Sequence, residues 1–254
     1  MKTKRHFADP YITDPVHRVT VNLIGAGGTG SQVISALARM DYALYKLGHP
    51  GLYVKVVDDD IVTEANIGRQ LFSATDIGLN KANVLATRIN SFYGLDWEAK
   101  PVRYEGNNIP PANITITCVD NVKSRLEICR KLRRSFCHED MKALYWLDFG
   151  NQLDRGQVVL GTVSKISQPK SKKYTTIEKL KCVDELFDLS AVDESESGPS
   201  CSLAEALRKQ DLFINSFIAQ TGCALLWKLI YDGIIDMQGA YVNLATMNVN
   251  PIKL

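Results

Sequence analysis

Long apolar runs are missing from this sequence, and their absence excludes a membrane-spanning helix. No apolar stretch of the 254-residue chain approaches the roughly 20 residues that a helix needs to cross a bilayer. The basic residues near the N-terminus are followed by "HFADPYITD" rather than by the apolar core of a secretion signal. Because 45% of the residues are nonetheless hydrophobic, the chain can bury a large core. We predict a soluble, cytoplasmic protein with no membrane partner.

A strong net charge is also missing. The 30 basic residues are balanced by 28 acidic ones, which leaves a net charge of +2. So small a charge provides no general attraction to nucleic acid. The one strongly basic stretch, residues 123–134, has its apolar residues at helical spacing, which predicts a surface helix with one buried face. We therefore predict no nucleic-acid partner.

Paired cysteines are a third absence. The six cysteines contain no CxxC pair, so the sequence indicates neither a zinc cage nor a thioredoxin-like site. Together with the missing secretion signal, this favours free thiols in a reducing compartment.

What is present is the pattern of an α/β protein. An apolar strand is expected over residues 19–24, a helix from Gly30 to about residue 48, and a second strand over residues 52–58. A crossover of this kind joins parallel strands. Further strands are expected within residues 97–104, 113–120, 143–150 and 156–164, and helices over residues 81–91 and 123–134. The predicted fold is a doubly wound, mostly parallel Rossmann-like sheet with helices on both faces.

The same pattern divides the chain into an N-terminal arm, residues 1–18, and a single domain, residues 19–254. Within the domain, residues 168–200 form a long crossover loop, basic at its start and acidic at its end, with one short helix around residues 184–189. Two helices, residues 201–210 and 211–231, and a strand or strand pair within residues 239–251 complete the prediction.

The stretch "VNLIGAGGTGSQ" joins the first strand to its helix through Gly25, Gly27, Gly28 and Gly30. Glycines let the backbone approach phosphate oxygens, and the helix that follows offers free N–H groups. Asp58, Asp59 and Asp60 follow the second strand, where a carboxylate can accept hydrogen bonds from ribose hydroxyls. Asp58 lies 28 residues after Gly30, whereas dehydrogenases use roughly 20. NAD and ATP both remain compatible with these residues.

The residues after the second strand favour ATP. Asn66, Arg69 and Gln70 come shortly after that strand, and Lys81 opens the next helix. An intact dinucleotide is satisfied by backbone amides, whereas a triphosphate under attack develops negative charge that Arg and Lys neutralise.

An acid and an amide, Asp120 and Asn121, stand where a later strand ends. Ligands bind beyond the carboxyl ends of strands in open α/β sheets. A carboxylate at this place can hold the Mg²⁺ that accompanies ATP, and it can also cap the helix that follows.

Taken in order, these motifs resemble the ThiF/MoeB/E1-like adenylating superfamily. The order is GxGGxG, DxD, NxxRQ, a helix-opening Lys, and a strand that ends in Asp-Asn with Arg125 close behind. The likeness covers about residues 19–231. The phrases "GRQLF" and "PSCSLAEALRKQDLFINSF" are most similar to the ThiF-family protein of bacterial PRTRC gene systems.

The resemblance implies an enzyme that uses MgATP to adenylate the C-terminal glycine carboxylate of a small ubiquitin-like or sulfur-carrier protein, releasing pyrophosphate. It also implies a homodimer. By this resemblance Asp58 takes the ribose, Asp120 the Mg²⁺, and Asn66 a further phosphate or metal-shell contact. Arg69 and Lys81 take the phosphates. The remaining nucleotide contacts are assigned to Gly25, Gly27, Gly28, Gly30, Asp60, Gln70 and Asn121. Because the attacking carboxylate is already ionised, no general base is required.

Superfamily members that go on to a thioester or an acyl disulfide use a cysteine near the crossover loop. Cys201 stands at a comparable place and opens an expected helix, where the dipole favours thiolate. Cys182, inside the loop, is a competitor. Cys118 and Cys223 are expected in the core.

The sequence departs from the superfamily in two respects. The CxxC zinc ligands of many members are absent, so we predict no structural zinc. Many members also carry an arginine well upstream of the first strand that reaches into the partner subunit's ATP site. Only Arg5 and Arg18 are available for that role here.

Two other functions remain open. An NAD-dependent Rossmann oxidoreductase would use the same loop, but it lacks an evident proton-donating His or Tyr-Lys pair and leaves Arg69 and Lys81 unexplained. An adenylation-dead adaptor would bind a ubiquitin-like protein without turnover; Arg69, Lys81 and Asp120 count against it, and the doubtful N-terminal arginine counts for it.

Overall fold

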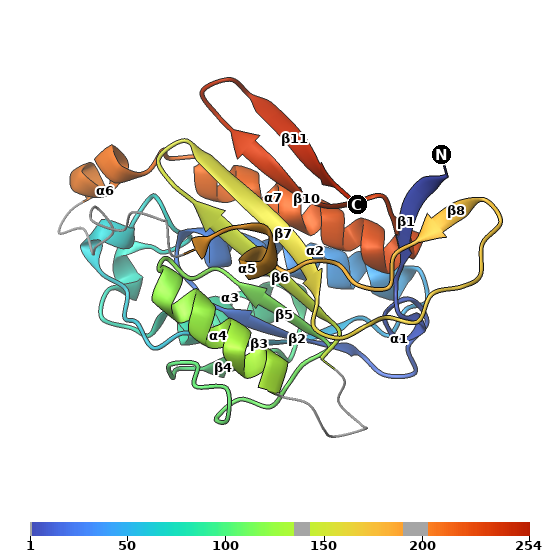
Figure 1. Cartoon of the computed structure of the whole chain (residues 1–254). Helices are drawn as coiled ribbons and strands as arrows, with labels where there is room; N and C mark the ends of the chain where they lie inside the picture. The colour runs from blue at the N-terminus through green and yellow to red at the C-terminus, as the bar shows by residue number, and fades with distance from the viewer. Residues whose placement is uncertain (1, 135–142, 190–202) are drawn as a thin grey trace.

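The computed structural model describes residues 2–134, 143–189 and 203–254, built around an eight-stranded sheet (Figure 1). The strands lie in the order β11-β10-β7-β6-β5-β2-β3-β4. The parallel strands are β2 (Val19–Ile24), β3 (Leu52–Val57), β4 (Glu98–Lys100), β5 (Ile114–Thr117) and β6 (Tyr145–Asn151). The antiparallel strands are β7 (Arg155–Thr162), β10 (Met237–Asn243) and β11 (Asn248–Lys253).

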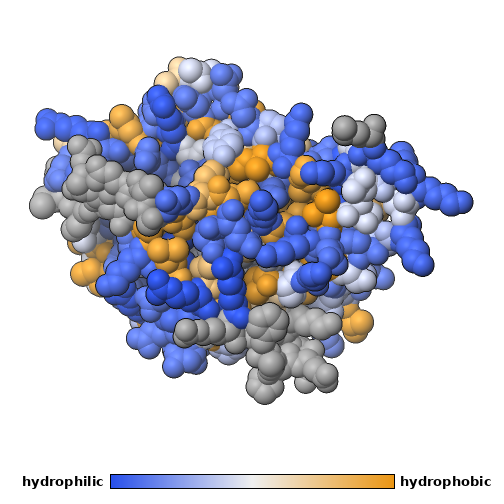
Figure 2. All heavy atoms as spheres, in the orientation of Figure 1, coloured by the Kyte–Doolittle hydropathy of each residue, from blue (hydrophilic) through white to orange (hydrophobic). Residues whose placement is uncertain are grey.

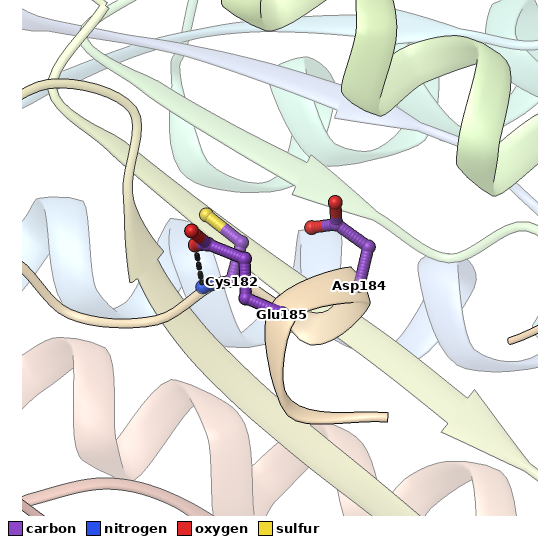
Figure 3. A group of neighbouring side chains, drawn as sticks. All are labelled: Cys182, Asp184 and Glu185. Atoms are coloured by element: carbon purple, nitrogen blue, oxygen red, sulfur yellow. Dashed lines mark hydrogen bonds between the residues drawn. The ribbon is translucent and has the colours of Figure 1, made fainter. Parts of the chain in front are cut away.

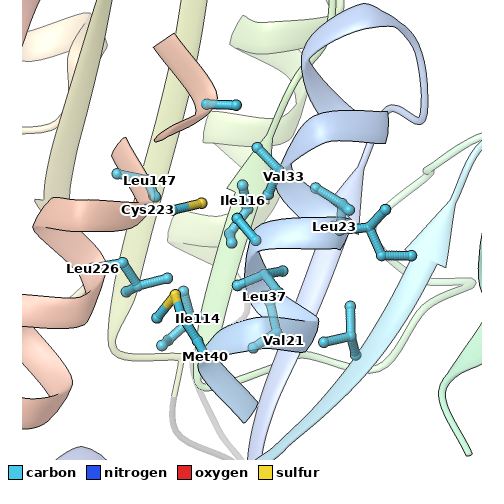
Figure 4. Packing of buried hydrophobic residues seen from close by; sticks show 14 of the residues in the cluster. Val21, Leu23, Val33, Leu37, Met40, Ile114, Ile116, Leu147, Cys223 and Leu226 are labelled. Carbon is cyan, nitrogen blue, oxygen red and sulfur yellow. The ribbon is translucent and has the colours of Figure 1, made fainter. Parts of the chain in front are cut away.

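Helices cover both faces of this sheet. One face packs against α2 (Gly28–Lys46), α3 (Lys81–Tyr93) and α7 (Ile214–Trp227), and the other against α4 (Val122–Arg134) and the short α5 (Val183–Leu186). The sheet residues alternate between two apolar clusters, as period-two side chains must. Val21, Leu23, Ile114 and Ile116 meet Val33, Leu37 and Leu226 on the first face (Figure 4). The predicted α/β fold class is confirmed.

The register of the parallel strands positions the functional residues. Ile24 pairs with Val57 on one side and with Thr117 on the other, so β2, β3 and β5 end at the same edge of the sheet. The glycine loop, the Asp58–Asp60 run and the Asp120–Asn121 pair therefore leave the sheet side by side. Two 3₁₀ turns, Glu64–Asn66 and Ala74–Asp76, and α6 (Leu203–Lys209) complete this edge.

Residues that precede β2 contribute one strand to a second, small sheet. Strand β1 (Thr3–Phe7) lies between β8 (Tyr174–Thr176), to which it is parallel, and β9 (Ile234–Ile235), to which it is antiparallel. A single turn of helix, α1 (Pro10–Thr13), connects it to the main sheet. In Figure 2 hydrophilic side chains project from the edge of the molecule where β1 and β8 lie. The division at residue 18 into arm and domain stays a prediction.

Several elements differ in length from the expectation. The strand expected within residues 97–104 is reduced to three residues because Pro101 follows it and cannot donate to the ladder. The final strand pair is present as β10 and β11, and α7 continues into a π-helical turn, Lys228–Asp232. Among the described residues, no helix combines the length and the apolar character that a bilayer crossing requires.

Candidate functional site

A cavity of about 370 Å³ opens at the edge where β2, β3 and β5 end. Ten of the residues predicted from the sequence line it: Gly25, Gly27, Gly28, Asp58, Asp60, Arg69, Gln70, Lys81, Asp120 and Asn121. Helices α2, α4 and α7 all begin at this cavity. Three positive helix ends and three cationic side chains, those of Arg69, Lys81 and Arg103, therefore face one space, which is an arrangement suited to a polyanion.

The four glycines of the loop are required for different reasons. Gly25 has a φ of +94°, and a Cβ there would lie 2.7 Å from the carbonyl oxygen of Cys118. A Cβ on Gly30 would collide with the carbonyl of Gly25. A Cβ on Gly27, in contrast, would meet nothing closer than the Gln70 side chain at 4.0 Å. Packing explains Gly25 and Gly30, whereas the open space over Gly27 is a cradle that a ligand can fill.

Asp58 connects this loop to the end of β3. Its Oδ2 accepts a hydrogen bond from the N–H of Ala26 at 2.5 Å, and its Oδ1 accepts one from the N–H of Asp60 at 2.8 Å. Burial raises the pKa of Asp58, while the Ala26 hydrogen bond and the charge of Lys81 oppose the rise. The carboxylate thus holds the loop in place, and each of its oxygens keeps a further lone pair for a ligand.

Lys81 reaches the cavity from the first turn of α3. Its Nζ lies 2.7 Å from Asp60 Oδ2, with only 9% of the lysine side chain exposed against 66% of the aspartate. Asn80, the N-cap of α3, donates to the carbonyl oxygens of Asp58 and Asp60 and so fixes the start of the helix against β3. Lys81 is therefore held at the cavity wall rather than extended into solvent.

Arg69 is a half-buried cation of the site whose donors are only partly satisfied by the described residues. Its Nη1 donates to Gln210 Oε1 at 2.5 Å, but its buried Nε has no hydrogen-bond partner within the described chain. Burial lowers the pKa of the guanidinium, and the charge of Asp120 opposes this effect. The buried Oε1 of the adjacent Gln70 likewise has no partner there. Unpartnered buried polar atoms are rare, and their presence at a cavity indicates a ligand.

Asp120 and Asn121 form the wall opposite Lys81, at the start of α4. Asn121 Oδ1 accepts a hydrogen bond from the N–H of Ser124, and its Nδ2 donates to Asp120 Oδ1 at 3.0 Å. Asp120 is exposed, so its carboxylate is accessible to a hydrated cation. The sequence predicted that Asp120 could both hold a cation and cap the helix that follows. In the structure Asn121 caps α4, and Asp120 is the exposed acid beside it.

Two predicted contacts lie off the cavity wall. Gly30 is buried beneath the loop. Asn66 is buried as well, and its Oδ1 accepts from both the N–H and the hydroxyl of Thr63. Cys201 lies outside the described residues, so its reactive role stays a prediction.

The other candidate thiol, Cys182, is an N-cap rather than a free thiolate. It is 4% exposed, its Sγ contacts the carbonyl of Thr162 at 3.6 Å, and burial raises its pKa to about 12. Its neighbours Asp184 and Glu185 bring oxygen atoms close to the sulfur (Figure 3). Those carboxylates are engaged, because Glu185 caps Cys182 N–H and pairs with Lys179, and Asp184 pairs with Arg133. The group is a capped, ion-paired helix start.

Of the two cysteines expected in the core, Cys118 and Cys223, only Cys223 is fully buried there. Cys223 is buried in the main apolar cluster, whereas Cys118 is half-buried and lines the cavity. Burial raises the pKa of both thiols, that of Cys223 to about 12. Neither is poised as a thiolate.

The two arginines upstream of β2 are engaged within the chain. Arg5 pairs with Asp236 at 2.8 Å, and Arg18 pairs with Asp96 and stacks over Tyr53. Neither arginine lines the cavity.

The residues of the cavity wall that sequence reasoning missed include three amides: Asn151, Gln210 and Asn215. Asn151 ends β6, and the other two flank the start of α7. Asn215 carried a weak signal in the sequence, because it is a polar residue near the start of the largely apolar stretch "INSFIAQTGCALLW". In the structure it is only 3% exposed. A buried amide on a core helix needs polar partners, which here are residues of the site.

Comparisons with known proteins were made with this geometry in hand. The model of the ThiF family matches residues 8–250. The crystal structure of E. coli MccB with MccA has a TM-score of 0.62 at 16% identity, covering 96% of this chain and 66% of that one. The structure of PaaA has a TM-score of 0.59 at 14% identity, covering 92% and 64%. A further MccB structure, which contains AMPCPP and MccA, has a TM-score of 0.59 at 16% identity and covers 95% and 65%.

These likenesses to solved structures establish the fold, and the chain spans about two thirds, 64–66%, of the length of the structures compared. No curated protein matches the sequence.

Proposed function

The chain belongs to the ThiF family, and we propose that it is an ATP-dependent adenylating enzyme that activates a carboxylate as its acyl adenylate. The observation that carries this proposal is Arg69. A half-buried guanidinium with one amide partner, and with a buried Nε that has no partner among the described residues, lies in the same cavity as the glycine loop and Lys81. Phosphate oxygens are the ligands that satisfy such a group.

The residues present fit MgATP. The open space over Gly27 admits phosphate oxygens to the start of α2, where no side chain of the described residues caps the helix. Asp58 would accept from the ribose, and Arg69 and Lys81 would bind the phosphates. Asp120 would hold Mg²⁺, which when bound neutralises phosphate charge. MccB, a fold relative, was solved with AMPCPP.

The reaction follows from these placements. A carboxylate oxygen of the substrate attacks the α-phosphorus of ATP, a new P–O bond forms, and the bond to the β-phosphate breaks with departure of pyrophosphate. Because the nucleophile is ionised at neutral pH, the protein has no proton to remove. Its task is to hold the two reactants in line and to neutralise the charge that develops on the leaving group.

For the substrate we propose the C-terminal glycine of a small ubiquitin-like or sulfur-carrier protein, such as one encoded in a PRTRC gene system. The support is the ordered motif set and the family, together with a fold relative, MccB, solved with MccA. Transfer to Cys201 and a homodimeric assembly belong to the same proposal.

ATP–pyrophosphate exchange tests the proposal. We expect exchange that requires a small protein ending in Gly and that Asp120→Ala abolishes. Asp232→Ala is the matched control, because this acid is exposed and lies in the π-helical turn after α7, away from the cavity. Absence of exchange with every partner, alongside tight binding of NAD, would establish the oxidoreductase instead. Partner binding without exchange would establish an adaptor.

A further inference from the structure

Two amide side chains lie between Arg69 and the glycine loop. Gln210 directly follows α6, and Asn215 is the second residue of α7. Gln210 Oε1 accepts hydrogen bonds from Arg69 Nη1 at 2.5 Å and from Asn215 Nδ2 at 2.9 Å. One oxygen therefore joins the cation of the site to the start of a buried helix.

Asn215 continues the connection to the loop. Its Oδ1 accepts from Thr29 Oγ1 at 3.0 Å and from Asn151 Nδ2 at 3.1 Å. Its amide packs directly on the loop backbone, because a Cβ on Gly28 would lie 2.7 Å from the side-chain atoms of Asn215. Gly28 is thus a glycine because of Asn215, while the space over Gly27 stays open.

The donors and acceptors of this network fix the orientation of both amide side chains. A guanidinium can only donate, so Gln210 must present its oxygen to Arg69. That same oxygen takes the amide N–H of Asn215, which leaves the oxygen of Asn215 for Thr29 and Asn151. Each amide orientation is determined by its neighbour, and hydrogen bonds in such a chain support one another.

We infer that Asn215, acting through Gln210, is a positioning residue that fixes the Arg69 guanidinium relative to the glycine loop. The inference rests on the proposed function, since it gives Arg69 the phosphates of ATP to meet. Arg69 follows Gly68, whose φ is +80°, in a turn between the bridged residues Ile67 and Gln70. This turn holds the backbone, whereas the guanidinium itself donates to Gln210. A misplacement of about 1 Å at a reacting centre can cost on the order of a hundredfold in rate.

Two variants test this role. Asn215→Asp keeps the shape but removes the donor to Gln210, and Gln210→Ala removes the shared acceptor. We expect each to weaken binding of AMPCPP about tenfold, to leave binding of adenosine unchanged, and to slow exchange at saturating ATP. Gln220→Ala is the matched control: Gln220 lies on the same helix, and its Oε1 accepts from Arg39 Nη2 at 2.6 Å on the exposed surface. It should change none of these quantities.

The deciding measurement places Gln210→Ala in an Arg69→Ala background. If Gln210 acts through Arg69, the second substitution adds less than about a twofold loss, because the interacting partner is already gone. An undiminished second loss, or AMPCPP affinity unchanged in both single variants, overturns the inference while the proposed function stands. A wild-type protein that does not bind AMPCPP overturns the proposed function and the inference with it. Should Asn215→Asp fail to fold, the half-buried Gln210 decides alone.

Discussion

Two arginines beside the same cavity are held in opposite ways. Arg125, on α4, donates from Nε to Asp148 Oδ1 at 2.9 Å and from Nη2 to the carbonyls of Val119 and Phe149. Arg69 has one amide partner, Gln210, and a buried Nε without any partner in the described chain. Arg125 directs its donors to the protein and ties the ends of β5 and β6 together. The donors that Arg69 leaves unpaired are those that the proposed function assigns to a ligand.

This difference separates structural from functional charge more clearly than burial does. Both arginines are at least half-buried, and both belong to the ordered motif set in the sequence. A buried charge is tolerated when it is paired and hydrogen-bonded. Where a buried charged group beside a cavity lacks a hydrogen-bond partner, we expect the substrate to supply that partner.

Removing the counterion of Arg125 should have the largest effect. Asp148 is 1% exposed, so Asp148→Ala leaves an uncompensated buried cation, and we expect the free energy of unfolding to fall by about 3–5 kcal/mol. Urea denaturation measures it. The control is Asp236→Ala, which breaks the partly exposed pair with Arg5 and should cost less than about 1 kcal/mol. Similar losses in the two variants would show that Arg125 does not depend on its pair.

Substitution of Arg69 should show the reverse pattern. Arg69→Met removes a charge whose burial is incompletely compensated, so stability should stay within about 1 kcal/mol of wild type. ATP–pyrophosphate exchange should fall by about 10²–10³-fold, the usual cost of one preorganised donor. Arg69→Lys should recover only part of the rate, because an ammonium lacks the planar fork. A variant that unfolds like Asp148→Ala yet retains exchange would reverse the two assignments.

Gly27 and Gly30 of the glycine loop show the same contrast between a ligand-binding and a structural position, without any charge. Gly27→Ala adds a methyl group to open space, so we expect AMPCPP affinity to drop at least about tenfold. Because Gly27 is the N-cap of α2, its stability cost should stay below about 1 kcal/mol. Gly30→Ala forces a collision with the Gly25 carbonyl and should lower stability first. Isothermal titration and urea denaturation separate the two, and equal destabilisation by both variants would contradict the distinction.

The smallest effect is expected for His6, a buried side chain whose two ring nitrogens are both hydrogen-bonded within the protein. Its Nδ1 donates to the carbonyl of Ile177 at 2.7 Å, its Nε2 accepts from the Tyr145 hydroxyl at 3.0 Å, and that hydroxyl accepts from Asp9 N–H. Burial lowers the pKa of His6 below its ordinary value of 6.5, while the Ile177 hydrogen bond opposes the shift.

As the pH falls through 6.5 the unfolded chain takes up the proton first. The stability that neutral His6 supports is therefore present above pH 6.5 and is lost below it, by at most about 1.4 kcal/mol per pH unit. In His6→Gln this loss should be absent, so the difference in free energy of unfolding between wild type and variant should change between about pH 7.5 and pH 5.5. A constant difference would show that the pKa of His6 is the same in the folded and the unfolded chain.

The sequence could predict those parts of the molecule that local pattern controls. Strand β2 begins and ends where its apolar run does, and the helix-opening Lys81 lies on the first turn of α3. The strand ends that carry Asp58 and Asp120 could be placed at one edge because parallel topology forces them there. Ten cavity residues were found in this way.

The remaining features depend on contacts between distant segments. Gln210 contacts Arg69 across more than a hundred residues and links it to Asn215, and no local sequence pattern predicts this contact. Asn66 occupies its motif position but turns its side-chain oxygen to Thr63 within its own turn. The motif predicts the position of Asn66 in the chain, and only the packed structure shows where its side chain points.

Strand β1 is synthesised long before the two strands that pair with it. Thr3 pairs with Tyr174, and His6 pairs with Ile235. At a synthesis rate of about 5–20 residues per second, β1 leaves the ribosome roughly ten to thirty seconds before β8 exists. During that interval it is an unpaired strand, the kind of segment that invites aggregation. Lys4 and Arg5 lie within it. These charges protect the strand while it waits, so their first contribution is made before the protein has folded.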